Sequence, residues 1–152
     1  MSLRDKLNED LKTAMKARDQ VRLDTVRLLL ADLKNVAIAQ MKGPGGDLDE
    51  ADALALLSRH KKQREESIVM FRAGNREDLA LADEAQLKII LSYLPQQLTR
   101  EDVVALVQGI VAEVGATSRK DMGKVMGKLM PQVKGRFPGD QVKGIVESVL
   151  PA

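Results

Sequence analysis

The sequence contains no cysteine, one histidine and three aromatic residues. Without cysteine, the chain cannot form disulfides, thiolate nucleophiles, or zinc and iron–sulfur sites with cysteine ligands. A single histidine, His60, excludes metal sites built on a histidine pair. Three aromatic side chains are too few for the stacking platforms that read single-stranded RNA. We therefore expect no metal, no cofactor and no base-stacking site.

Long apolar runs are also missing. No segment approaches the roughly 18 to 20 apolar residues that cross a bilayer, and the amino end has no apolar signal-peptide core. The sequence therefore predicts a cytoplasmic protein without membrane contact. Its net charge is only +2, from 24 basic and 22 acidic residues. The positive charge is concentrated locally, because residues 119–136 contain six basic residues and a single acidic one, Asp121.

Apolar residues recur at intervals of three and four along almost the whole chain, and strict alternation is absent. This pattern predicts an all-α fold. Capping residues and the glycine–proline segments give approximate limits for the helices. The first helix is expected to begin at residue 3 and to include residue 15. The others are expected at residues 19–42, 49–73, 76–93, 99–114, 118–130 and from 140 onwards.

A domain boundary is expected at Leu94-Pro95, because the residue before a proline is pushed out of helical geometry and a new capping signal follows at Thr99. The chain then divides into an amino-terminal four-helix module, residues 1–95, and a small three-helix module, residues 96–152. A module of about 55 residues buries little apolar surface. We expect the smaller module to lean on the larger one or to be marginally stable alone.

Two charged residues of the third predicted helix point along its apolar stripe. They are Lys61 and Arg64, and a charge directed at a core needs a partner. The turn expected at Gly74-Asn75 brings Asp83 and Glu84 opposite them in an antiparallel hairpin. We interpret these four residues as a structural ion pair between two helices, with contact to a ligand or protein as the alternative.

A row of lysines beside two glycines is the most informative surface pattern. On a helical wheel, Lys120, Lys124 and Lys128 form a strip, and Gly123 and Gly127 adjoin it. Glycine destabilises a helix by about 1 kcal/mol relative to alanine, so something should gain from the missing side chains. A basic connector with Lys134, Gly135 and Arg136 follows. Together these residues suit contact with a nucleic-acid backbone.

Two other interpretations of this strip stay open. Lysines at this spacing also occur on ordinary solvated faces, and glycines four apart also mark close packing of two helices. No catalytic constellation is found, since Ser58 and Lys61 lack the companion motifs of a serine enzyme. His60 is expected in solvent or in the hairpin interface.

Several segments occur in the order typical of one family. They are KQREESI at 62–68, REDLA at 76–80, YLPQQL at 93–98, DMGKVM at 121–126, Met130-Pro131 and Lys134–Arg136. The chain resembles the YqeY family of small bacterial proteins over nearly its whole length. The resemblance implies a four-helix part followed by a three-helix part, of the same type as the tail of the GatB subunit of glutamine-dependent tRNA amidotransferase.

In GatB this tail is understood to hold the outer corner of tRNA, where the D and T loops meet. The resemblance places Gly123, Lys124, Gly127, Lys134 and Gly135 at the glycine- and lysine-bearing positions of the tail. The same homology carries the label of a carbon–nitrogen ligase with glutamine as amido-N-donor. The chain lacks the GatB catalytic cradle and an amidase, so enzymatic activity is left open and no catalytic residue is assigned.

The sequence thus supports one leading hypothesis and two alternatives. The first is a tRNA-binding accessory protein that reads folded tRNA shape without catalysis. The second is a protein-interaction module that docks an amidotransferase or an aminoacyl-tRNA synthetase. The third is a free-standing amide-transferring enzyme, for which neither an ATP site nor an ammonia source is found.

Overall fold

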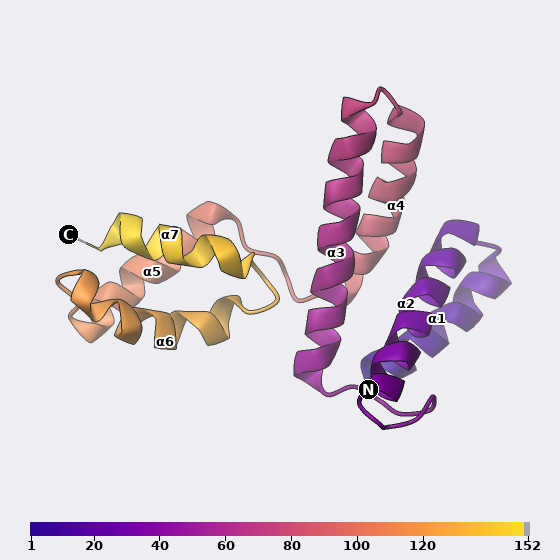
Figure 1. The fold of residues 1–152 in the computed structure, drawn as a ribbon, viewed down its shortest axis with the longest axis horizontal. Coiled ribbons are helices and arrows are strands. Elements are labelled where there is room, and N and C mark those ends of the chain that lie inside the picture. The colour runs from indigo at the N-terminus through magenta and orange to yellow at the C-terminus, as the bar shows by residue number, and fades with distance from the viewer. Residues whose placement is uncertain (151–152) are drawn as a thin grey trace. The chain divides into compact units, whose positions relative to one another are not determined.

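The structure, a computed structural model, describes residues 1–150 and is all-helical, as predicted. Within that range it has seven α-helices, one 3₁₀ turn and no strand (Figure 1). None of the described helices is both long and apolar enough to span a membrane. The elements are α1 (Leu3–Ala17), α2 (Gln20–Ala39), α3 (Glu50–Ala73), α4 (Glu77–Tyr93), α5 (Arg100–Val114), η1 (Arg119–Asp121), α6 (Met122–Val133) and α7 (Gly139–Val149).

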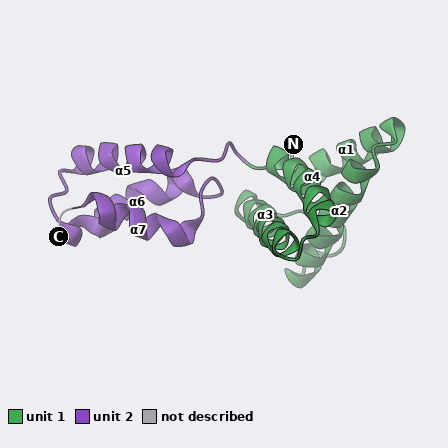
Figure 2. Cartoon of the chain, turned by 90° about the horizontal axis from the view of Figure 1, so that it is seen from above, with its two compact units in different colours: residues 1–94 green, residues 95–152 purple. Residues whose placement is uncertain are grey.

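The chain forms two compact units, which Figure 2 shows in separate colours. Unit 1 comprises Met1–Leu94 and carries α1 to α4, and unit 2 begins at Pro95 and carries α5 to α7. The boundary predicted from the sequence, after Pro95, lies one residue later. Each unit has its own apolar core.

Unit 1 consists of two helical hairpins. Ser2 begins α1 with a capping box, in which its side chain accepts from the Asp5 N–H and the Asp5 carboxylate accepts from the Ser2 N–H. Asp49 caps α3, as the sequence predicted, and its side chain accepts from the Asp52 N–H. The helices enclose one core, whose fully buried side chains include Leu7, Val26, Leu29, Leu33, Leu56, Leu57 and Ile90.

The turn between α3 and α4 is made by Gly74 and Asn75, as the sequence suggested, but Asn75 supplies the left-handed backbone. Its φ is 58°, whereas Gly74 has an ordinary φ of −90°. Asparagine tolerates this conformation better than most residues. The turn lets α3 and α4 run side by side in antiparallel directions.

Of the four residues expected to form an ion pair across this hairpin, Arg64 and Asp83 lie together. A guanidinium nitrogen of Arg64 is 3.3 Å from a carboxylate oxygen of Asp83, and both side chains are mostly buried. The same nitrogen donates to Gln86 at 3.2 Å. The other two assignments were wrong. Lys61 pairs with Glu65 of its own helix, and Glu84 pairs with Arg72.

These corrections have a geometric cause. Lys61 and Glu65 are one helical turn apart, so they meet whatever lies across the hairpin. Arg72 stands near the hairpin turn and reaches both Glu77 and Glu84. Glu84 therefore finds its ion-pair partner, Arg72, closer to the turn than the sequence register suggested.

His60 is buried rather than solvated, and it faces α2 rather than α4. Its side chain is 6% exposed, and its Nε2 lies 2.6 Å from a carboxylate oxygen of Asp32. Arg59 also pairs with Asp32. Burial raises the pKa of Asp32, but hydrogen bonds from His60 and Arg59 outweigh it and hold the pKa below its ordinary value.

Unit 2 is a three-helix arrangement with its own core. The fully buried residues come from all three helices and include Val103, Val107, Val125, Leu129, Ile145 and Val146. Thr99 forms a capping box with Asp102 at the start of α5, and Gly115 ends the helix with a φ of 67°. Ten buried apolar residues within the described part of this unit make a continuous core of its own.

Candidate nucleic-acid interface

The segment that carries the predicted lysine row begins with a split helix cap. Ser118 Oγ accepts from the Lys120 N–H at 3.3 Å, and the Asp121 carboxylate accepts from the Thr117 N–H at 3.0 Å. Between these contacts, residues 119–121 form the 3₁₀ turn η1. Lys120 therefore precedes α6 instead of belonging to it, which corrects the expected single helix of residues 118–130.

The carboxylate of Asp121 is the only acidic group of this basic segment, and it stays ionised. Its hydrogen bond from the Thr117 backbone, with a further contribution from the charge of Lys124, holds its pKa below the ordinary value. Asp121 thus stands at the start of α6, where a negative charge is favoured by the helix dipole.

Helix α6 also runs further than predicted, because Pro131 does not end it. Pro131 has no N–H to donate to the carbonyl oxygen of Gly127, but the Lys134 N–H still bonds to Met130 at 3.0 Å. The added turn buries Val133, which is 1% exposed in the core of unit 2. Burial of this side chain offsets the loss of one helical hydrogen bond.

The outer side of α6 combines two lysines with two bare glycines. We call Gly123, Lys124, Gly127 and Lys128 the lysine–glycine face; Lys120 precedes it and Lys134 follows it along the chain. All of these residues are exposed. The opposite side of α6 is apolar and packs into the core through Val125 and Leu129, both fully buried.

The two glycines are not used to pack α6 against another helix of the described chain. A Cβ added at Gly123 or at Gly127 would have no neighbour within 4 Å. Each glycine nevertheless weakens the helix by about 1 kcal/mol relative to alanine. The close-packing interpretation of the glycine spacing therefore fails within the described part of this chain, and the exposed backbone is accessible from outside.

The basic residues differ in how they are engaged. Lys128 pairs with Glu113 of α5 at 2.6 Å, although both side chains are about half exposed. Lys120, Lys124 and Lys134 have no carboxylate within ion-pair distance among the described residues. Three ammonium groups of this segment thus remain available for an external anion.

Arg136, which was expected at the same interface, has a structural task. Its guanidinium donates from Nε to the carbonyl of Gln96 at 3.0 Å and from Nη1 to the carbonyl of Gln132 at 3.2 Å. The neighbouring Gly135 adopts a φ of 75° and accepts from Gln97 at 2.9 Å. Residues 135–136 therefore tie the start of unit 2 to the end of α6.

These features define a class: a two-unit helical protein whose second unit carries an exposed, partly unpaired lysine strip next to open glycines. Within residues 1–150 no cluster of histidine, aspartate or glutamate that could hold a metal is found. The model of the family described as "Yqey-like protein" matches residues 4–150 of the chain. The protein belongs to this family.

Its relatives include fungal proteins named "Altered inheritance of mitochondria protein 41, mitochondrial". The relative from Lachancea thermotolerans is 36% identical over 110 residues, which cover 71% of this chain and 57% of the relative. That from Kluyveromyces lactis is 32% identical over 133 residues, covering 82% and 70%. That from Pyrenophora tritici-repentis is 28% identical over 133 residues, covering 86% and 71%.

The chain spans about half the length of two of the curated relatives that it matches: 57% of the relative from Lachancea thermotolerans and 46% of the one from Vanderwaltozyma polyspora. The relatives are mitochondrial proteins of fungi by name, so the resemblance to bacterial proteins described only part of the family. The cytoplasmic location expected for this chain stays a prediction.

Proposed function

We propose that this protein binds folded tRNA through the lysine–glycine face and the flanking Lys120 and Lys134, and that it catalyses no reaction. The supporting observation is the open space outside Gly123 and Gly127, next to ammonium groups that lack carboxylate partners in the described chain. The two glycines are one helical turn apart, so the surface of α6 lacks side chains at two positions that adjoin each other. A helix with such a bare surface can lie close to a ribose–phosphate backbone. The resemblance of this unit to a tRNA-holding tail supports tRNA as the RNA.

The binding is expected to read shape rather than sequence. Lysine ammonium groups bind phosphates as point charges, and no aromatic side chain lies on α6 to stack on a base. Residues 120–134 extend over about 20 Å if the rise per residue is helical. Such a strip can contact several phosphates on a rigid, folded RNA.

The salt dependence of tRNA affinity tests the proposal. Three free lysines predict about three phosphate contacts and a slope of about −3 in a plot of log affinity against log salt concentration. Lys124→Ala should reduce the steepness by about one. Lys143→Ala, an exposed lysine of α7, is the matched control and should leave the slope unchanged. A flat salt response, or equal slopes for both variants, contradicts tRNA binding at this face.

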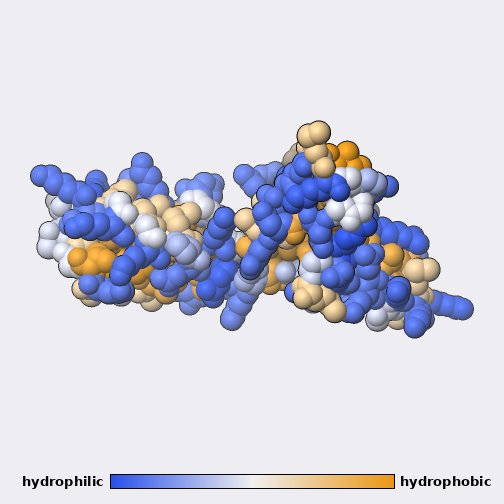
Figure 3. Space-filling view, turned by 90° about the horizontal axis from the view of Figure 1, so that it is seen from below, coloured by the Kyte–Doolittle hydropathy of each residue, from blue (hydrophilic) through white to orange (hydrophobic). Residues whose placement is uncertain are grey.

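A second function, docking of a protein partner such as an amidotransferase or an aminoacyl-tRNA synthetase, is favoured by a feature of unit 1. Figure 3 shows a mainly hydrophilic face with separate hydrophobic patches. Of the ten large apolar side chains that are most exposed, all but Met130 belong to unit 1, and they include Met41, Val69 and Met70. Where exposed apolar side chains gather in a contiguous patch, they are typical of protein interfaces.

Copurification from the native host separates the two functions. RNA that remains bound after washing at low salt and leaves at high salt supports the first function. A stoichiometric protein that remains bound at high salt, with no RNA, supports the second. Glutaminase and ATPase measurements on the same material test the third possibility of an amide-transferring enzyme.

A further inference from the structure

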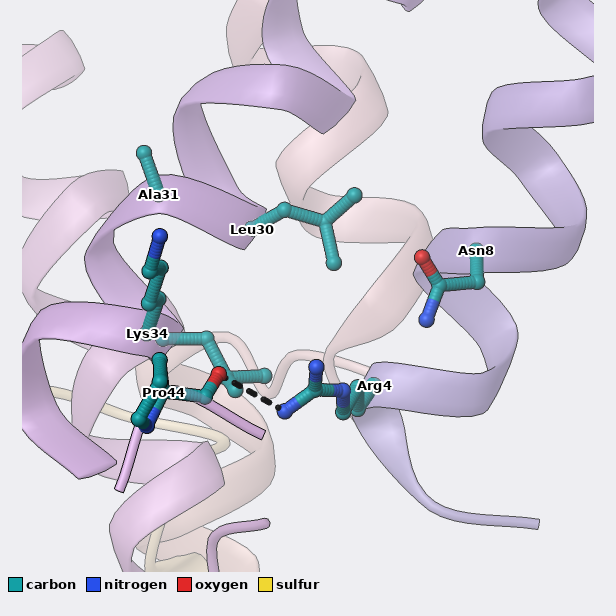
Figure 4. Close-up of a pocket in the computed structure, with 7 residues that line it drawn as sticks. Arg4, Asn8, Leu30, Ala31, Lys34 and Pro44 are labelled. Carbon is teal, nitrogen blue, oxygen red and sulfur yellow. Dashed lines mark hydrogen bonds between the residues drawn. The ribbon is translucent and has the colours of Figure 1, made fainter. Parts of the chain in front are cut away.

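A small cavity lies in unit 1, on the side of the α1–α2 hairpin where the glycine-rich loop returns. It has a volume of about 240 Å³. Arg4 and Asn8 of α1 stand on one side, Leu30 and Lys34 of α2 on the other, and Pro44 closes one end (Figure 4). The cavity does not involve α6, so it is independent of the proposed RNA contact.

The loop that closes the cavity is constrained by its backbone geometry and by hydrogen bonds. Gly43 has a φ of 77°, and the Gly46 N–H bonds to the Gly43 carbonyl at 3.1 Å. A Cβ at Gly46 would lie 2.5 Å from the Cβ of Lys42, so no other residue fits there without a shift of the chain. The Arg4 guanidinium donates to the carbonyl oxygens of Gly46 at 2.8 Å and Pro44 at 3.3 Å. This wall of the cavity is thus preformed in the protein without a ligand.

The charge around this cavity has one sign. Arg4 and Lys34 are cationic, and no carboxylate lines the space. Neither cation forms an ion pair within residues 1–150; the partners of Arg4 are neutral carbonyls of the loop. Carbonyl groups orient a guanidinium without cancelling its charge, and a cleft lined by one sign of charge concentrates the opposite ion.

The rest of the lining is apolar or amide. Leu30, Leu33 and Pro44 supply apolar surface, and Asn8 supplies an amide that can donate or accept. A pocket that combines a few polar groups with an apolar wall binds small organic molecules. A volume of about 240 Å³ lies below the range usual for pockets that bind drug-sized molecules, roughly 300 to 1,000 Å³, so a small ligand fits this site best.

We propose that this cavity binds a small organic anion, with a carboxylate or phosphate group between Arg4 and Lys34 and a short apolar body against Leu30 and Pro44. Both anionic groups accept hydrogen bonds from guanidinium and ammonium donors. Arg4 then has two roles, because it fixes the loop through Nη1 and presents its remaining N–H groups to the anion. Lys34 stands at the rim and supplies the second charge.

Titrations of the full-length ¹⁵N-labelled protein test this site, with benzoate, phenyl phosphate, inorganic phosphate and neutral benzyl alcohol as probes. With benzoate or phenyl phosphate, the amide chemical shifts of Asn8, Ala31 and Lys34 are expected to change and to saturate at millimolar probe concentrations. The probe that binds more tightly identifies the anionic group that the site prefers. Equal binding of benzyl alcohol contradicts the role of charge. Equal binding of inorganic phosphate contradicts the apolar part of the site. No shift with any probe contradicts the site altogether.

A charge-removing variant gives the second readout. Lys34→Met should weaken binding of the better probe by about fivefold, as expected for one solvated ionic contact. The exposed Lys34 side chain makes no hydrogen bond or ion pair within the described residues, so its replacement should leave the fold intact. Lys88→Met, an exposed lysine of α4 away from the cavity, is the matched control. Equal affinities in the two variants would overturn the proposal.

Discussion

The ammonium group of Lys128 lies 2.6 Å from a carboxylate oxygen of Glu113, so an ion pair joins α6 to α5 at the lysine–glycine face. This contact withholds one of the two lysines of that face from an external phosphate. Glu113 is therefore placed to lower the affinity of the protein for RNA. An exposed ion pair of this kind contributes about 0 to 1 kcal/mol, so RNA can displace it.

Glu113→Gln should increase tRNA affinity, because it frees Lys128 for a further phosphate contact. The expected gain is up to about fivefold at low salt, with a salt slope steeper by about one. Glu101→Gln removes the same charge from the exposed first turn of α5 and controls for net charge. Binding curves at several salt concentrations provide the measurement. If both variants bind equally well, the specific contact has no role.

Replacement of Gly123 and Gly127 by alanine should change stability and binding in opposite directions. Each alanine should raise the free energy of unfolding by about 0.5 to 1 kcal/mol, because it restricts the unfolded chain and its Cβ meets no neighbour within 4 Å. The same methyl groups should weaken tRNA binding if the RNA lies close to α6. Urea unfolding and tRNA titration of one double variant measure both effects.

Gly109→Ala is the control for this variant. Gly109 lies in α5, and a Cβ there would also meet no neighbour within 4 Å. It should stabilise the protein by about as much as each of the two alanines in α6, and it should leave tRNA affinity unchanged. Unchanged tRNA binding in the double variant would remove the argument from the open glycines.

The carboxylate of Asp83 should contribute more to stability than that of Glu65, because the Asp83 side chain is 12% exposed and the Glu65 side chain is 50% exposed. Asp83→Ala leaves the Arg64 guanidinium mostly buried without its charge partner, and the expected loss is about 1 to 3 kcal/mol. Glu65→Ala should change stability by less than about 0.5 kcal/mol. Chemical unfolding measures both. Similar losses of stability in the two variants would mean that solvent screens the Arg64–Asp83 ion pair as strongly as the Lys61–Glu65 pair.

The lowered pKa of Asp32 predicts that the stability of unit 1 depends on pH. Its pKa is below the ordinary value in the folded protein, so its contribution to stability is fully present above the unfolded pKa of about 4. The contribution is lost as the pH falls through the folded pKa, because the protonated carboxyl no longer pairs with Arg59 and His60. Asp32→Ala should therefore destabilise the protein at pH 7, by about 1 to 3 kcal/mol.

The difference between Asp32→Ala and the unchanged protein should shrink as the pH falls from about 4 towards 2. Thermal unfolding at several pH values within this range and at pH 7 checks the result. Asp24→Ala, on an exposed turn of the same helix, is the control and should show no such convergence. A constant difference across the range would exclude the charge of Asp32 as the cause.

Local features of this protein could be predicted from the sequence because their causes lie within a few residues. Helical periodicity established the all-α fold, and Ser2, Asp49 and Thr99 marked helix starts because a cap bonds to N–H groups two or three residues later. The family was predicted from ordered motifs and is shown by the match to residues 4–150.

Contacts between helices were harder to predict, since they depend on how far each helix is rotated and where its neighbour crosses it. The partners of His60 and Glu84 were missed for this reason. Tertiary burial also outweighed a local rule at Pro131, where the core position of Val133 carries α6 through a residue that usually ends a helix. The apolar spacing of Val125, Leu129 and Val133 continues across this proline, and it is the sequence signal that pointed to a longer helix.

The sequence by itself determined which residues form helices and where positive charge gathers, because short-range geometry and composition are written in neighbouring residues. Only the tertiary structure decided which of those charges are free. It pairs Lys128 with Glu113, engages Arg136 with backbone carbonyls and leaves open space outside Gly123 and Gly127. These outcomes depend on groups far apart in the chain, which packing alone brings together.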